Sequence, residues 1–258
     1  MKRFIANFKK YRYLLMELTK KEVKLKYRNS VLGLLWTLIE PFLTMIVLTI
    51  VFGTIMGRTK NFAVYILIGK LIFSYFSNGT KQELKSIRKN GSMIRKVYVP
   101  KYMYPLSASM STYITFLFSL IVLVGVAAYE GIKPTIYTLG AIVPLITVFL
   151  LVTSIGFFVS TLDVFFRDLE YIWNVFTMLI MYMSAIFYDS KKLLNSKYAF
   201  MLKYNPLFAI ITNFRAAVID AKGLNLYYTW YPLAVSAFFL IFGLLLFYKK
   251  QDRFVLYV

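Results

Sequence analysis

Two charged side chains lie inside long apolar stretches of this sequence, where ionisable chemistry is unusual. Glu40 interrupts the apolar run 31–57, and Lys70 interrupts the run 63–80. A charge at the centre of a bilayer costs at least ~2.5–3.5 kcal/mol, so such residues point to function. At 1.5 Å per residue, Glu40 lies ~14 Å and Lys70 ~20 Å from the inner face of a membrane. A pair between neighbouring helices is one interpretation. In the other, Glu40 lies near an interface and Lys70 extends outward.

The residue types that are absent exclude several kinds of chemistry. The sequence has no Cys and no His, which removes thiol nucleophiles, thiolate metal sites and the commonest general base. It also has no G-x-x-x-x-G-K-[S/T] phosphate loop, because Leu71 follows Gly69-Lys70. The chain is therefore not expected to be an enzyme or to bind a cofactor or metal by itself. Energy for uphill movement must come from a gradient or another subunit.

The remaining acidic residues are too scattered for acid–base catalysis. Asp163 and Asp168 flank Arg167, which predicts a local ion-pair turn or a contact with a partner. A paired-carboxylate hydrolase needs its acids around one cleft. This argues against a membrane-embedded glycan polymerase or ligase.

The elements that must position these residues are membrane-spanning helices. Hydrophobic residues make up 59% of the 258 residues and charged residues only 16%, against ~25% charged in soluble domains. A span needs ~20 apolar residues. We predict one all-α polytopic transmembrane domain over residues 1–258. Its six predicted spans are 31–57, 63–80, 105–128, 136–161, 171–188 and 229–248.

The basic residues predict the orientation of these spans. Ten Lys and Arg precede the first span and two follow it directly, which places both termini in the cytoplasm. The net charge of +20 is then mostly a topology signal with attraction to anionic lipids, and no nucleic-acid partner is expected.

Residues 1–28 have the pattern of an amphipathic helix in the cytoplasmic interface, and a plain basic tail is the alternative. One apolar stripe recurs at helical spacing between flanking lysines. It comprises Phe4, Phe8, Tyr11, Leu15 and Leu18.

The cytoplasmic loop 81–104 combines basic residues with a few apolar ones. Asn90-Gly91 is a turn or helix-stop signal. Met93, Ile94 and Val97 suit a docking element, in which apolar anchors are ringed by charge. A solvated loop that rests on lipid headgroups is the equal alternative.

The outer segment 189–228 is too long for a simple connection. Asn205 is a good N-cap and Pro206 suits the first helical turn. Apolar residues follow at helical spacing, and a second short apolar-faced helix precedes them. We expect both helices to dip back into the outer leaflet and to cap the pathway of the bundle.

Taken in order, five short strings resemble the permease subunits of ATP-binding-cassette exporters of polysaccharides and polyol phosphates, which include O-antigen and teichoic-acid exporters. The strings are KYRNSVLGLLW at 26–36 with EP at 40–41, KVYVP at 96–100, FFRDL at 165–169, NPL at 205–207, and FR at 214–215. One departure is Ala185, where members of the family often have Pro.

The resemblance implies a homodimer paired with two copies of a separate cytoplasmic ATPase, which would hold ATP and Mg. The substrate would be a lipid-linked glycan, crossing the bacterial cytoplasmic membrane through a continuous channel. An ABC permease for a small-molecule drug or lipid is the alternative. Residues 190–221 would form the outer gate, with Asn205, Pro206, Phe214 and Arg215, and residues 84–97 the coupling helix. The expected coupling residues are Ser86, Ile87, Arg88, Asn90, Gly91, Ser92, Met93, Ile94 and Val97.

The aromatic content fits glycan transport, because sugar C–H faces lie well on aromatic rings. Packing in the core or against lipid is the competing explanation for each ring. The candidate channel-lining residues are Trp36, Phe42, Tyr65, Phe73, Tyr182, Phe187 and Tyr188.

Overall fold

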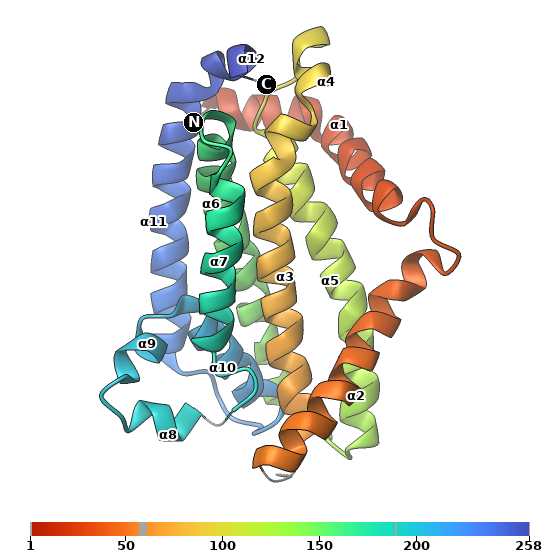
Figure 1. The fold of residues 1–258 in the computed structure, drawn as a ribbon, viewed down its shortest axis with the longest axis vertical. Coiled ribbons are helices and arrows are strands. Elements are labelled where there is room, and N and C mark those ends of the chain that lie inside the picture. The colour runs from red at the N-terminus through yellow and green to blue at the C-terminus, as the bar shows by residue number, and fades with distance from the viewer. Residues whose placement is uncertain (1, 57–60, 189, 258) are drawn as a thin grey trace.

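The described chain is a bundle of long helices capped by short ones at both ends (Figure 1). The computed structural model describes residues 2–56, 61–188 and 190–257, which leaves the predicted boundaries at residues 1, 57, 189 and 258 outside it. The long helices are α1 (Lys2–Tyr27), α2 (Trp36–Met56), α3 (Phe62–Lys89), α5 (Met103–Tyr129), α6 (Ile142–Phe165), α7 (Leu169–Tyr182) and α11 (Leu226–Lys250). The shorter elements are η1 (Gly33–Leu35), α4 (Gly91–Lys96), η2 (Ile136–Ala141), α8 (Ser190–Leu194), α9 (Ala199–Lys203), α10 (Pro206–Val218), η3 (Gln251–Arg253) and α12 (Phe254–Tyr257).

Five helical segments among the described residues are long and apolar enough to cross a membrane. They contain α2, α3, α5, α6 and α11, and match five of the six predicted spans in place. Over the predicted span 171–188, α7 has 14 residues, or ~21 Å of helix against a ~30 Å hydrocarbon core. The reason is local, because the chain leaves the helix after Tyr182 and Ala185 adopts a φ of 47°. A sixth span remains a prediction.

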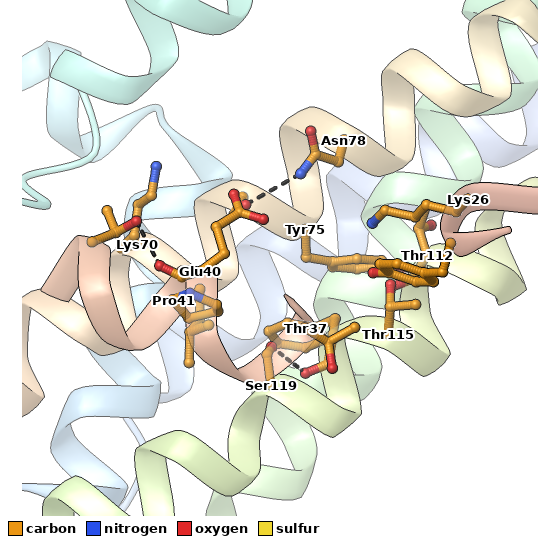
Figure 2. Close-up of a pocket in the computed structure, with 15 residues that line it drawn as sticks. Lys26, Thr37, Glu40, Pro41, Lys70, Tyr75, Asn78, Thr112, Thr115 and Ser119 are labelled. Carbon is orange, nitrogen blue, oxygen red and sulfur yellow. Dashed lines mark hydrogen bonds between the residues drawn. The ribbon is translucent and has the colours of Figure 1, made fainter. Parts of the chain in front are cut away.

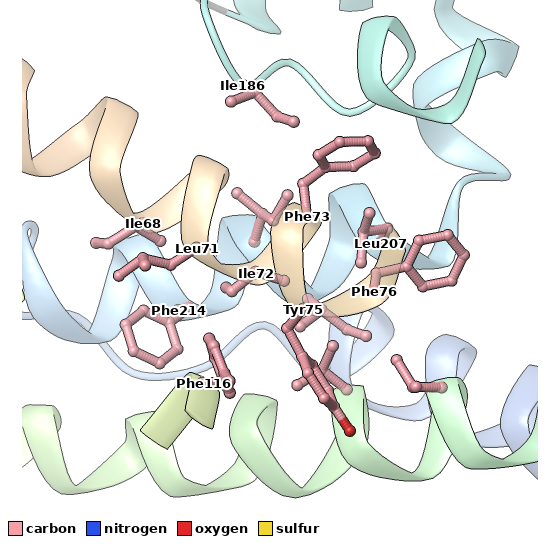
Figure 3. Close-up of a cluster of buried hydrophobic side chains, with 14 of the residues drawn as sticks. Ile68, Leu71, Ile72, Phe73, Tyr75, Phe76, Phe116, Ile186, Leu207 and Phe214 are labelled. Carbon is pink, nitrogen blue, oxygen red and sulfur yellow. The ribbon is translucent and has the colours of Figure 1, made fainter. Parts of the chain in front are cut away.

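The core lies around α3, which packs against α2, α5, α6, α7 and α10. Figure 3 shows apolar side chains of α3 directed at those of α5 and α10. Ile68 and Ile72 of α3 are almost fully buried, as are Ile210 and Ile211 of α10. Both faces of α3 are therefore covered by protein, whereas α2 and α11 are mostly exposed.

At one end, which we call the α4 end, α1 lies across the bundle, and α4 and α12 also gather there (Figure 1). Helix α1 occupies the range of the predicted amphipathic helix. Leu15 and Leu18 of its stripe are buried in a cluster with Ile87 and Ile94, and α1 packs on α5. This part of the stripe faces the protein itself. The side chains of Phe4 and Phe8 lie outside the described residues.

The opposite end, the α10 end, holds α8, α9 and α10 (Figure 1). Asn205 caps α10, because its side-chain oxygen accepts hydrogen bonds from the backbone N–H groups of Leu207 (2.9 Å) and Phe208 (3.4 Å). Pro206 follows at the first helical position, where its missing N–H costs nothing. The predicted helix start at Asn205-Pro206 is confirmed.

Candidate docking surface, charge clusters and groove

The predicted coupling helix 84–97 is two helices in the structure. Helix α3 runs on to Lys89, Asn90 ends it, and α4 follows from Gly91 to Lys96. The break is at Asn90-Gly91, where the sequence predicts a helix stop, and the coupling role of residues 84–97 stays a prediction. The helix breaks there because Asn and Gly readily leave the α conformation.

The predicted coupling residues divide into an inner and an outer set. Ser86, Ile87, Gly91 and Ile94 are buried, and Met93 packs against the same cluster as Ile94. The exposed residues of the segment 91–98 form what we call the docking surface. It comprises Ser92, Arg95, Lys96, Val97 and Tyr98. Sequence reasoning included Ser92 and Val97 but missed the other three, although Tyr98 is 88% exposed.

A charge cluster ties α3 to α6 and α7 beside this surface. Arg88 donates to Glu170 Oε2 (2.9 Å), and its Nε lies 3.4 Å from Asp163 Oδ2. Lys85 pairs with the other oxygen of Glu170. The hydrogen bond from Lys85 lowers the pKa of the Glu170 carboxyl, and Arg88 adds to this effect. Asp163 therefore pairs with Arg88 of α3 in place of the predicted local partner Arg167. Both Arg167 and Asp168 are exposed.

Near that cluster, Glu83 of α3 is fully buried against α6. A Cβ placed on Gly156 of α6 would lie 1.7 Å from Glu83 Oε2, so only glycine fits there. The adjacent Ser109 and Thr153 hydroxyls are hydrogen-bonded to each other at 2.7 Å. The contact between Glu83 and Gly156 fixes the register of α3 on α6, and no pattern in the sequence predicted it.

At the α10 end, the buried charged side chain that links helices is Arg215 of α10. Its guanidinium donates to the backbone carbonyls of Tyr65 (3.0 and 3.2 Å), Ala185 (3.0 Å) and Ile186 (3.2 Å). It also lies over the Tyr65 ring, at 3.4 Å from the centroid. Arg215 thus joins α3, α10 and the turn after α7. Proline could not occupy position 185 in this turn, because its ring holds φ near −65°.

The other predicted gate residue of α10, Phe214, is buried in the main core. The predicted channel-lining aromatics do not gather around one cavity. Trp36, Phe42 and Tyr182 are exposed, and Phe73 is buried in the core. Tyr65 lies under Arg215, Phe187 stacks on Phe52, and Tyr188 donates to the carbonyl of Tyr182.

Two cavities lie along α2 and differ in chemistry. One is apolar, has a volume of about 640 Å³, and lies between α2 and α5, with Phe42 and Met45 in its wall. The other, which we call the polar groove, is smaller at about 70 Å³ and contains both Glu40 and Lys70 (Figure 2). The polar groove comprises Lys26, Tyr27, Thr37, Glu40, Pro41, Thr44, Lys70, Leu71, Ser74, Tyr75, Asn78, Thr112, Thr115, Phe116 and Ser119.

Glu40 and Lys70 share this groove without forming an ion pair. Across the described part of the chain, the ion pairs involve Glu17, Glu22, Asp163 and Glu170. The sequence signal for the groove was available in α5. Thr112, Thr115 and Ser119 recur at spacings of three and four in a mostly apolar helix, which places them on one face.

Comparison with known proteins agrees with this architecture. The family description "ABC-2 type transporter" matches residues 13–219. An O-antigen export system permease protein RfbA from Klebsiella pneumoniae is 30% identical over 244 residues, covering 93% of each chain. A protein of the same name from Myxococcus xanthus is 25% identical over 224 residues, covering 86% of each. The chain belongs to the ABC-2 type transporter family.

Proposed function

We propose that this chain is the permease subunit of an ABC exporter that moves a lipid-linked polysaccharide of the O-antigen type across the bacterial cytoplasmic membrane. The observation that carries the proposal is the match to O-antigen export permeases along 93% of both chains. The membrane-spanning helices and the absence of a phosphate-binding loop in the sequence are consistent with a transport subunit. A polyol-phosphate substrate such as a teichoic acid is the second member of the same class.

In this proposal the chain works as a homodimer, and each copy holds one separate ATPase subunit, which binds ATP and Mg. The α4 end faces the cytoplasm, because the excess of basic residues lies in the segments that gather there. Helices α8 to α10 then lie toward the outer leaflet as the outer gate.

The docking surface is the proposed contact with the ATPase. It carries two exposed apolar side chains, Val97 and Tyr98, beside the basic Arg95 and Lys96. Such apolar anchors within a charged rim are typical of protein interfaces. Motion of α4 reaches the bundle because α3 ends directly before α4 and is the most buried of the spans.

Deletion of the gene followed by complementation tests the function. We expect surface glycan to disappear on deletion and to return with the wild-type chain. Unchanged surface glycan, with altered sensitivity to small toxic compounds, would instead support the small-molecule permease.

Copurification tests the docking surface. We expect the double variant Val97→Asp/Tyr98→Asp to retain ~10-fold less ATPase, because two apolar anchors become charged. Leu226→Asp at the α10 end, also an exposed apolar residue, is the matched control and should retain the ATPase. Met93 and Ile94 are less suitable targets, because they pack inside the protein. Equal ATPase retention by the double variant and wild type would contradict the docking role.

A further inference from the structure

The polar groove lies within the membrane-spanning part of the bundle, where an apolar wall is the usual arrangement. Figure 2 shows its residues on α2, α3 and α5 directed at one shared space. Along α5, Thr112 and Ser119 are seven residues apart, so the hydroxyl face extends for ~10 Å. The groove is therefore an elongated polar strip parallel to the helices.

The hydroxyl groups of this strip have already used their protons. Thr115 donates to the carbonyl of Thr112 (2.9 Å), and Ser119 donates to that of Phe116 (2.6 Å). Thr112 donates to carbonyls of its own preceding turn at 2.9 and 3.0 Å. A hydroxyl has one proton but two lone pairs. These hydroxyl oxygens can therefore still accept a hydrogen bond.

The opposite wall on α2 has the same character. Thr37 donates to the carbonyl of Leu34 and Thr44 to that of Glu40, both at 2.7 Å. The Glu40 carboxylate only accepts hydrogen bonds when ionised. The hydroxyls of α2 and α5 thus present acceptors, while the ammonium groups of Lys26 and Lys70 and the amide of Asn78 add donors.

A wall of acceptors selects a ligand that carries donors. A phosphate group could pair with Lys26 or Lys70, but it brings only acceptor oxygens and negative charge to the Thr and Ser oxygens and to Glu40. Sugar hydroxyls carry one donor each and also accept, which suits both the walls and the two lysines. Tyr75 and Phe116 also line the groove, but they stack on each other at 4.9 Å between centroids and are almost fully buried, so they supply apolar wall and no open ring face.

We propose that the polar groove is a carbohydrate-binding subsite, which holds the hydroxyl-rich part of the glycan at membrane depth. This inference rests on the proposed function and names where the chain contacts its substrate. None of the seven aromatic residues predicted to line a channel contributes to this groove, so the subsite is separate from that set.

Removing the hydroxyls without changing the shape tests the subsite. We expect the triple variant Thr112→Val/Thr115→Val/Ser119→Ala to lower the export rate ~10-fold, because three acceptors are lost. The matched control is Thr54→Val on α2. Thr54 makes the same kind of bond, to the carbonyl of Ile50 at 2.7 Å, but lies outside the groove. The control should export as the wild type does.

Thiol protection supplies a readout that does not depend on the stability of the triple variant. The natural chain has no Cys, so a single introduced thiol reports without background. Ser74→Cys in the groove is treated with a water-soluble cationic methanethiosulfonate in membrane fragments from cells with and without glycan synthesis. We expect modification to be several-fold slower with glycan present. Val124→Cys, on the exposed face of α5, should show no difference.

The outcomes separate the subsite from the proposed function. Unchanged surface glycan after deletion of the gene would overturn both. Wild-type export by a stably produced triple variant, with deletion abolishing export, would overturn the subsite alone. Equal modification of Ser74→Cys with and without glycan would also overturn it.

Discussion

The two ends of the bundle hold their helices together with different arrangements of charge. At the α4 end, Lys85 and Arg88 pair with Asp163 and Glu170, and most of these side chains remain partly exposed. At the α10 end, the buried Arg215 has three neutral backbone carbonyls as described partners. One end uses several exposed pairs, and the other uses one enclosed cation.

This difference has an energetic meaning. Exposed ion pairs contribute about 0–1 kcal/mol each and are weakened by salt, so they can break and re-form at little cost. A buried guanidinium cannot leave its carbonyls without exposing unpaired groups, each worth about 1–3 kcal/mol. The α4 end is therefore built for adjustment, which fits the proposal that its docking surface contacts an ATPase. The α10 end is built to stay closed around Arg215.

The largest effect is expected at Arg215. Arg215→Met keeps much of the apolar stem but removes every guanidinium hydrogen bond to Tyr65, Ala185 and Ile186. Each buried carbonyl left without a donor costs about 1–3 kcal/mol. We expect a clear fall in the thermal unfolding midpoint of the detergent-purified protein. Arg95→Met, exposed on the docking surface, is the control, and an equal midpoint for both variants would contradict the comparison.

The next effect is expected at the buried Glu83–Gly156 contact near the ion pairs of the α4 end. Gly156→Ala forces a methyl group into Glu83 and should destabilise by about 1–3 kcal/mol through overpacking. A second substitution, Glu83→Ala, should restore part of the loss by making room. Gly125→Ala in α5 has nothing within 4 Å of its new Cβ and should not lower stability. The unfolding midpoints of these variants measure the contact, and no rescue by Glu83→Ala would count against it.

How far the sequence predicts these features depends on the range of the interaction. Asn205-Pro206 at a helix start and Asn90-Gly91 at a helix end act on their own neighbours, and both signals correspond to real boundaries. Arg215 is different, because its partner Tyr65 lies 150 residues away. The sequence shows that an arginine is present near the predicted outer helices, but it does not show which carbonyls surround that arginine.

The same limit explains why the sequence did not predict which residues line the polar groove. Apolar runs located five spans, yet periodicity does not give the rotation of each helix about its axis. The aromatic residues were therefore assigned to a channel by type, and the structure distributes them between surface and core. Hydroxyl spacing in α5 was a second signal, because it places Thr112, Thr115 and Ser119 on one face of the helix.

The smallest effect is expected at Glu170, and it is the one that distinguishes the two ends by pH. Lys85 and Arg88 lower the pKa of this carboxyl, so the folded chain favours its ionised form. Its contribution to stability is present above the unfolded pKa near 4.5 and is lost as the pH falls through the folded pKa.

After allowance for solvent, Glu170→Gln should cost no more than about 1 kcal/mol at pH 7. The wild type and the variant should converge in acid and in high salt, because protonation and screening each remove the attraction. Arg215→Met should keep its deficit in high salt, because Arg215 is buried and salt screens buried interactions much less than exposed ones. The unfolding midpoints of the wild type and the two variants, measured across pH and salt, test this difference between the two ends. A Glu170→Gln deficit that persists in acid would mean that packing, not charge, holds α7 to α3.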